Sequence, residues 1–207
     1  MRVLYAIALM SLGLSVLAAA QDNAPKPKVS KSPLTAEQVA VYRAVLEDYT
    51  KGNDGALNLA NRTEPLEESG PFFDKACLKG LALENNAQSV PVVHQLDRAV
   101  ALNEKMVLVD PDQQEKKIEG NDPQKLVNRA IVDGERVTEK QLDGSVRQAF
   151  ATGLFTLSEI VFDKQHCHAV LAYSFVCGGL CGHGKTLALK KVGQKWKISK
   201  RCGGWIS

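Results

Sequence analysis

The sequence predicts a single α+β domain, over residues 34–207, that ends in a C-terminal antiparallel β-meander. Three observations lead to this prediction. An amphipathic pattern with helical spacing starts at Thr35, helix-start signals fill the middle of the chain, and the C-terminal stretch alternates apolar with polar side chains. The chain of 207 residues, 44% apolar and 24% charged, suffices for one hydrophobic core. Its net charge of +3 is too small to indicate a nucleic-acid partner.

Residues 1–20 have the composition of a secretory signal peptide. Arg2 supplies a positive charge, residues 3–18 form an apolar run, and small residues precede an expected cleavage before Gln21. The apolar run is shorter than the ~20 residues of a membrane-spanning helix. We therefore expect an exported protein, secreted or periplasmic. Prolines, lysines and serines over residues 21–33 predict a flexible linker before the domain.

A long N-terminal helix is expected over residues 36–51. It begins with the capping box Thr35–Gln38, in which the Thr hydroxyl and the Gln amide satisfy free backbone N–H groups at the helix start. Gly52 is a typical helix end. One helical face carries the apolar residues Val39, Tyr42, Leu46 and Tyr49.

Three helix-start signals mark the middle of the chain. Asp110-Pro111 and Asp122-Pro123 each place an N-cap before a proline in the first helical turn, and Thr138–Gln141 is a second capping box. These signals predict helices at about 112–118, 123–131 and 138–151. The other elements expected here are an extended segment at 58–65, a short helix at 72–83, and strands at 90–96 and 105–110.

The C-terminal stretch predicts the meander, with Gly193-Gln194 as a tight hairpin turn. The expected strands are 157–162, 167–177, 186–192 and 195–202. Alternation in the last strand places Trp196, Ile198 and Cys202 on one face, and Lys195, Lys197 and Arg201 on the other.

The stretch Val176–Thr186 contains a match to the phosphate-binding loop, G-x-x-x-x-G-K-T, from Gly179 to Thr186. A working loop needs a helix after the lysine and a later magnesium-binding acid. Here the residues after Thr186 alternate as a strand, and none of them is Asp or Glu. We therefore reject nucleotide binding and interpret the stretch as a glycine-rich hairpin loop.

Five cysteines in an exported chain indicate disulfides with one thiol left over. In the meander Cys177 and Cys202 lie two strands apart, ~10 Å, which is too far for a direct bond. We expect Cys177 to pair with Cys181 across the loop and Cys77 to pair with Cys202. Cys167 would then be a free thiol, buried by its strand parity. A Cys181–Cys202 pairing is the alternative.

No catalytic, cofactor-binding or metal site is predicted, and no cofactor. His166 and His168 are zinc-ligand types, but they lie ~30 Å along the strand from Cys177. The sequence has no G-x-S-x-G motif and no supported Ser-His-Asp set.

The possible binding face is basic and consists of Lys195, Lys197 and Arg201. Such a face suits an anionic envelope polymer or an acidic protein. A solvated surface whose lysines protect a sheet edge from aggregation is the simpler interpretation. No nucleic-acid partner and no transmembrane segment after signal removal are expected.

The C-terminal sequence resembles a group of uncharacterised exported bacterial proteins. In these, a C-G-x-L-C-G-x-G loop and a G-x-W-K hairpin lead to a final W-I-S, as in Cys177–Gly184, Lys195–Ile198 and Trp205–Ser207 here; Cys77–Gly80 is also similar. The resemblance implies an envelope or secreted location, and it provides no functional residues.

For the architecture we expect the first helix to lie across a curved sheet, as in NTF2-like or cystatin-like folds. The leading functional hypothesis is a non-catalytic, disulfide-stabilised exported binding domain. The alternative is an enzyme or small-ligand-binding protein with a pocket between helix and sheet.

Overall fold

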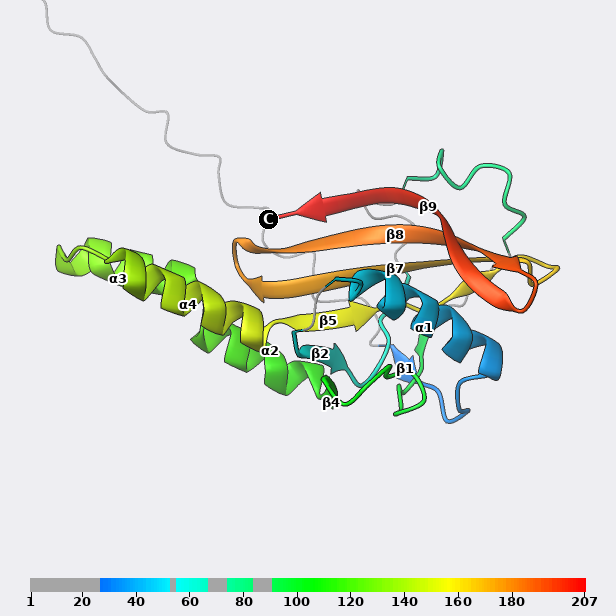
Figure 1. Ribbon diagram of the computed structural model, residues 1–207, viewed down its shortest axis with the longest axis horizontal. Helices are drawn as coiled ribbons and strands as arrows, with labels where there is room; N and C mark the ends of the chain where they lie inside the picture. The colour runs from blue at the N-terminus through cyan, green and yellow to red at the C-terminus, as the bar shows by residue number, and fades with distance from the viewer. Residues whose placement is uncertain (1–26, 53–54, 67–73, 84–90) are drawn as a thin grey trace, which may run out of the picture.

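A mostly antiparallel β-sheet organises the protein in our computed structural model, which describes residues 27–52, 55–66, 74–83 and 91–207. The strand order is β4-β2-β5-β7-β8-β9, and β6 pairs with β7 (Figure 1). Strand β2 pairs in parallel with β4 and β5, whereas the pairings from β5 to β9 are antiparallel. The fold is therefore of mixed α and β type, as predicted.

The strands are β1 (Lys28–Val29), β2 (Leu57–Ala60), β3 (Val92–Val93), β4 (Met106–Val109), β5 (Leu154–Leu157), β6 (Val161–Phe162), β7 (His168–Gly178), β8 (Cys181–Val192) and β9 (Lys195–Ile206). The helices are α1 (Ala36–Tyr49), α2 (Pro111–Gly120), α3 (Pro123–Asp133) and α4 (Glu139–Thr152). The starts of all four helices follow from the capping residues predicted at Thr35, Asp110, Asp122 and Thr138.

Helix α1 packs against one face of the sheet, here called the inner face, which carries Phe155, Leu171 and Leu187 (Figure 1). Tyr42 and Leu46 of the helix are fully buried in this interface. Burial of a large apolar side chain stabilises a fold by ~1.5–3 kcal/mol. The hydrophobic core therefore lies between α1 and the meander.

The opposite, outer face of the sheet is covered in two places. Residues 74–83 place Leu78 against Val170 and Ala188. Helix α2 covers the other end, where its Ile118 packs with Leu154.

Ion pairs tether both ends of α1 to the meander. Near its start, the Glu37 carboxylate binds Lys191 Nζ at 2.6 Å and His166 Nδ1 at 2.8 Å. Near its end, Asp48 binds the guanidinium of Arg201 at 2.7 Å. These contacts fix the direction in which α1 crosses the strands.

The face predicted for Cys202 is wrong because β9 contains a β-bulge. Leu189 pairs with Ile198, but the next residue back, Ala188, pairs with Lys200, so Ser199 is an extra residue in β9. A bulge reverses the alternation of side chains beyond it. Cys202 consequently lies on the outer face, not beside Trp196 and Ile198.

Several predicted boundaries also differ from the structure. The strand expected at 157–162 is divided into β5 and β6, because Ser158 donates its hydroxyl to the next carbonyl and accepts the N–H of Ala172. The last two strands extend beyond their predicted ranges, since β8 and β9 stay paired as far as His183 and Ile206.

Two further expectations concern the partly described regions. Over 74–83 the predicted short helix is replaced by successive turns, with Asp74 accepting the N–H groups of Ala76 and Cys77. Within the expected linker at 21–33, strand β1 pairs in parallel with β3. The signal peptide expected at 1–20 and residues 72–73 lie outside the described residues. Within the described part of the chain, no helix has the length and apolar character to span a membrane.

We expect the Glu37 cluster to make stability dependent on acid pH. Partial burial acts to raise the pKa of Glu37, but the hydrogen bonds from Lys191 and His166 outweigh it, so the pKa lies below its ordinary value of 4.5. A carboxyl group with a lowered pKa contributes stability above its unfolded-state pKa and loses it as the pH falls through the folded-state pKa.

Glu37→Gln should therefore lower the free energy of unfolding at pH 7 by up to ~1 kcal/mol. The free energy of unfolding, measured by urea titration, should also decline less between pH 5 and pH 3 in this variant than in wild type. Glu47→Gln, an exposed change on the same helix, is the control. Equal pH dependence in wild type and Glu37→Gln would contradict this role.

Candidate functional site

An apolar pocket of about 520 Å³ lies between α3, α4 and the turn that joins β7 to β8. We call it the helix–hairpin pocket. It forms where α3 and α4 extend past the end of the sheet (Figure 1). The main apolar side chains that line it are Val127, Leu142, Val146, Phe150, Phe175 and Leu180.

The Asp122 carboxylate sets the position of α3 at this pocket. One oxygen, Oδ1, accepts the N–H of Gln124 at 2.9 Å as the N-cap of α3. The other, Oδ2, accepts the N–H of Gly179 in the β7–β8 turn, also at 2.9 Å. A single side chain therefore joins the helix start to the hairpin and holds two walls of the pocket together.

Helix α4 forms another wall and leaves part of its apolar face exposed. Ala149 is fully buried, and the rings of Phe150 and Phe175 stack with centroids 6.0 Å apart. Leu142 and Val146 remain 40% and 37% exposed. Large apolar side chains exposed together often mark a binding surface.

His183 supplies an imidazole to this apolar lining. Its ring contacts Phe175 and Tyr49, with centroid separations of 5.8 Å and 5.9 Å. Burial, assisted by the charge of Lys185, lowers the pKa of His183 below 6.5. The ring is therefore mostly neutral at pH 7 and offers one hydrogen-bond donor and one acceptor. Within the described part of the chain, no hydrogen bond to either ring nitrogen is found.

Both expected disulfides are present. Cys77 and Cys202 have Cα atoms 5.5 Å apart, and Cys177 and Cys181 have Cα atoms 5.1 Å apart. The alternative Cys181–Cys202 pairing is not formed. The Cys177–Cys181 disulfide also lines the helix–hairpin pocket, so the glycine-rich hairpin loop contributes to the candidate site.

Cys167 is the free thiol, as expected, but it is exposed rather than buried. The Asp163 carboxylate accepts the N–H groups of both Cys167 and His168 and forms a turn that precedes β7. Because Cys167 belongs to this turn, the side-chain alternation of the strand does not apply to it.

The phosphate-loop match lies in the β7–β8 hairpin. Thr186 is in the middle of β8, which continues to Val192, so a strand follows the Gly-Lys-Thr sequence. The match therefore lacks the helix that directly follows the lysine in a phosphate-binding loop. Within the described residues, no group of three or more His, Cys, Asp or Glu side chains is placed to hold a metal ion.

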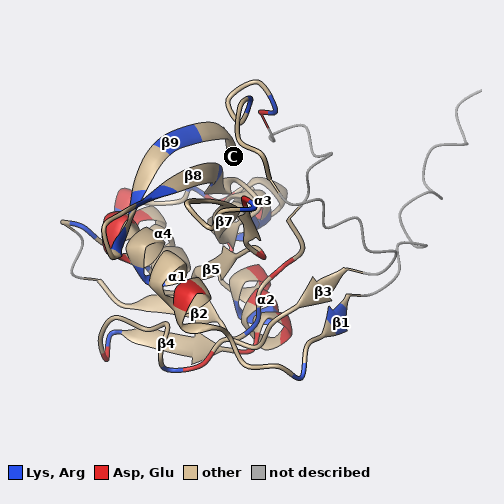
Figure 2. Ribbon diagram, turned by 90° about the vertical axis from the view of Figure 1, so that its right-hand side faces the viewer, with Lys and Arg blue, Asp and Glu red and all other residues tan. Residues whose placement is uncertain are grey.

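The predicted basic face is divided by the bulge at Ser199. Lys195 and Lys197 lie on the outer face, where Lys197 is directly opposite Lys190. Arg201 lies on the inner face and pairs with Asp48, so its assignment to the basic face is corrected. Figure 2 shows the lysine and arginine positions along β8 and β9.

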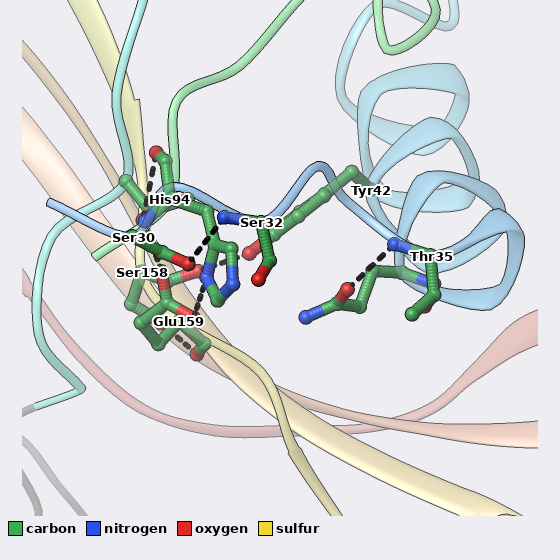
Figure 3. Close-up of polar contacts among 9 residues, drawn as sticks. Ser30, Ser32, Thr35, Tyr42, His94, Ser158 and Glu159 are labelled. Carbon is green, nitrogen blue, oxygen red and sulfur yellow. Dashed lines mark hydrogen bonds and ion pairs between the residues drawn. The ribbon is translucent and has the colours of Figure 1, made fainter. Parts of the chain in front are cut away.

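A partly buried polar pair that was not predicted from the sequence joins His94 to Glu159 (Figure 3). Glu159 accepts the His94 backbone N–H at 2.8 Å and contacts His94 Nδ1 at 2.9 Å, and it also accepts the Thr63 hydroxyl. Nearby, the Tyr42 hydroxyl donates to the Ser158 carbonyl at 3.1 Å. These bonds attach the β3 region to the segments beside the sheet, and we assign the pair a structural role.

The residues of the pocket were also missed from sequence, because they come from separate segments of the chain. One signal was available: Leu142, Val146 and Phe150 recur every four residues along α4, which is the spacing of one helical face.

Comparisons with protein-family models, curated proteins and solved structures found no match. The function is therefore argued from the geometry of this pocket.

The two disulfides should differ in their effect on stability. Replacing Cys77 and Cys202 by serine removes a link between residues 125 positions apart and should lower the free energy of unfolding by ~2–5 kcal/mol. Replacing Cys177 and Cys181 opens a link between residues only 4 positions apart and should cost less. Urea titration of the oxidised proteins measures both; a larger loss for the second pair would contradict this order.

Proposed function

We propose that the protein is an exported, disulfide-stabilised domain that binds a small, mainly apolar molecule in the helix–hairpin pocket. The observation that carries this proposal is the pocket itself. Its volume of about 520 Å³ lies within the ~300–1,000 Å³ range of small-molecule sites. Such sites combine an apolar and aromatic lining with few polar groups. In this pocket His183 is a polar group within the apolar lining.

The lining favours a neutral ligand with an aromatic or aliphatic body. Phe150 and Phe175 offer ring surfaces to such a body, and the His183 ring can donate to or accept from one polar group. Asp122 is the acidic residue of the lining, and its oxygens already accept two backbone N–H groups. The described lining residues include no Lys or Arg, so a negatively charged group has no cation to pair with.

We propose binding rather than catalysis. A general base is commonly oriented by a second group. The carboxylate–imidazole pairs among the described residues are Glu159–His94, Glu37–His166 and Asp163–His168. None of these residues lines the helix–hairpin pocket. His183 instead contacts aromatic rings, which suits it to position a ligand.

The proposed location and architecture rest on different observations. Export is inferred from the signal-like residues 1–20 and the C-terminal resemblance, and the two disulfides support it because such bonds persist in oxidising compartments. An NTF2-like or cystatin-like arrangement is supported by the packing of α1 across the meander. The parallel strands β2 and β4 would extend such a sheet at one edge.

N-phenyl-1-naphthylamine, a neutral aromatic dye that fluoresces in apolar sites, tests the pocket. Wild-type protein should bind it saturably. Val146→Trp should fill the pocket and weaken binding tenfold or more, equivalent to ~1.4 kcal/mol. Ile131→Trp is the matched control because Ile131 is 72% exposed on α3 and does not line the pocket.

Circular dichroism must show that both variants keep the wild-type fold. Absence of saturable binding to wild type, or equal affinity in wild type and a folded Val146→Trp protein, would overturn the proposal.

The basic outer surface is a second candidate, for binding an anionic envelope polymer. It consists of Lys190, Lys195 and Lys197, which form no ion pair within the described residues. On the inner face, by contrast, Lys191 and Arg201 pair with carboxylates of α1. Like charges placed directly opposite each other, as in Lys190 and Lys197, repel unless an anion lies between them.

Dextran sulfate tests this surface. The double variant Lys190→Gln/Lys197→Gln should bind the polymer several-fold more weakly at low salt, and the difference should disappear as salt screens the charges. The control is the double variant Lys116→Gln/Lys125→Gln, which removes two positive charges from exposed helix lysines and so has the same net charge as the test variant. Equal losses in the two double variants would show that only net charge matters.

A further inference from the structure

We infer that the outer face of the sheet carries a second ligand site, separate from the helix–hairpin pocket, that suits a small polyhydroxylated molecule of the saccharide class. The site is a groove of about 350 Å³. We call it the hydroxyl groove. Its lining includes Thr156, Ser158, Ser174, Thr186 and Trp205.

The groove exists because the central strands carry small residues on this face. Ala172 pairs with Thr186 and Ser174 pairs with Gly184, which leaves a shallow floor across β7 and β8. On one side of this floor the outer face is covered by residues 74–83, and on the other by α2. The floor between these two covers is hollow, where larger side chains would have filled it.

Trp205 forms an aromatic wall of the groove. A Cβ atom added at Gly184 would lie 2.4 Å from its Nε1, and one added at Gly182 would lie 3.0 Å from Cη2 and Cζ3. Two separate parts of the ring therefore contact β8, and the indole lies along the strand. The positive φ of Gly203, 62°, belongs to the second bulge of β9, which directs Trp205 to this face. A flat aromatic surface is suited to the C–H face of a sugar ring.

The floor supplies hydroxyl groups. Thr156 Oγ1 and Ser174 Oγ lie 2.6 Å apart and bond to each other across β5 and β7. Each hydroxyl has one donor and two acceptor positions, so the pair retains capacity for further hydrogen bonds. The groups of the groove thus match the alternating donors and acceptors of a polyol.

Thr186 points to a ligand independently. The residue is only 5% exposed, yet its hydroxyl makes no hydrogen bond within the described part of the chain. Among the described residues, no fully enclosed side-chain oxygen or nitrogen lacks a partner. The Thr186 hydroxyl must therefore reach the open space of the groove, where a ligand hydroxyl would pair with it. An unpaired polar group in such a position favours ligands that can bond to it.

Saturation-transfer difference NMR on the intact protein tests the site, because this method detects weak binding. The probes are maltotriose and chitotriose. We expect transfer to the ring protons of at least one probe. Thr186→Val keeps the side-chain shape. It should reduce the affinity of the protein for that saccharide about tenfold, as loss of one buried hydrogen bond predicts. Ser174→Ala should also weaken binding and provides a second test if Thr186→Val does not fold.

Thr152→Val is the matched control, since the Thr152 hydroxyl bonds Gln148 O on α4 and does not line the groove. No transfer to either saccharide would overturn the inference, and so would wild-type affinity in a folded Thr186→Val or Ser174→Ala protein. The dye experiment on the helix–hairpin pocket is unaffected by either result, because the two sites share no lining residue.

Discussion

The register of the β7–β8–β9 meander is the constraint on which the other features depend. Side chains alternate between the two faces of a strand, so one extra residue moves all the following side chains to the opposite face. The bulges at Ser199 and Gly203 do this twice in β9. The first bulge places Arg201 beneath α1 and Cys202 on the outer face, and the second returns the alternation before Trp205.

This register gives the two faces different chemistry. On the inner face, the cations of the last strands meet the carboxylates of α1, and the apolar residues bury Tyr42 and Leu46. On the outer face, the Cys77–Cys202 disulfide holds residues 74–83 against the sheet, and the hydroxyl groove lies beside that cover. The stable core and the proposed groove are therefore on opposite sides of the same strands.

The helix–hairpin pocket depends on a different contact, the Asp122 carboxylate shared between α3 and the turn at Gly179. An N-cap aspartate ordinarily serves only its own helix. Here its second oxygen also fixes the hairpin that the Cys177–Cys181 disulfide closes. The apolar lining of α4 then encloses a volume instead of forming an open surface. The Asp122 side chain thus both caps α3 and holds that helix against the β7–β8 turn.

The sequence by itself determined the features that depend on neighbouring residues: the four helix starts, the Gly193 turn and the antiparallel meander. It also led to the two disulfides, because the distance between strands follows from their order. Tertiary structure decided the face of Cys202, the exposure of Cys167, the His94–Glu159 pair and the lining of both sites. These depend on a bulge, a turn and contacts between distant segments, and no local pattern encodes them because their free energy arises only when those segments meet.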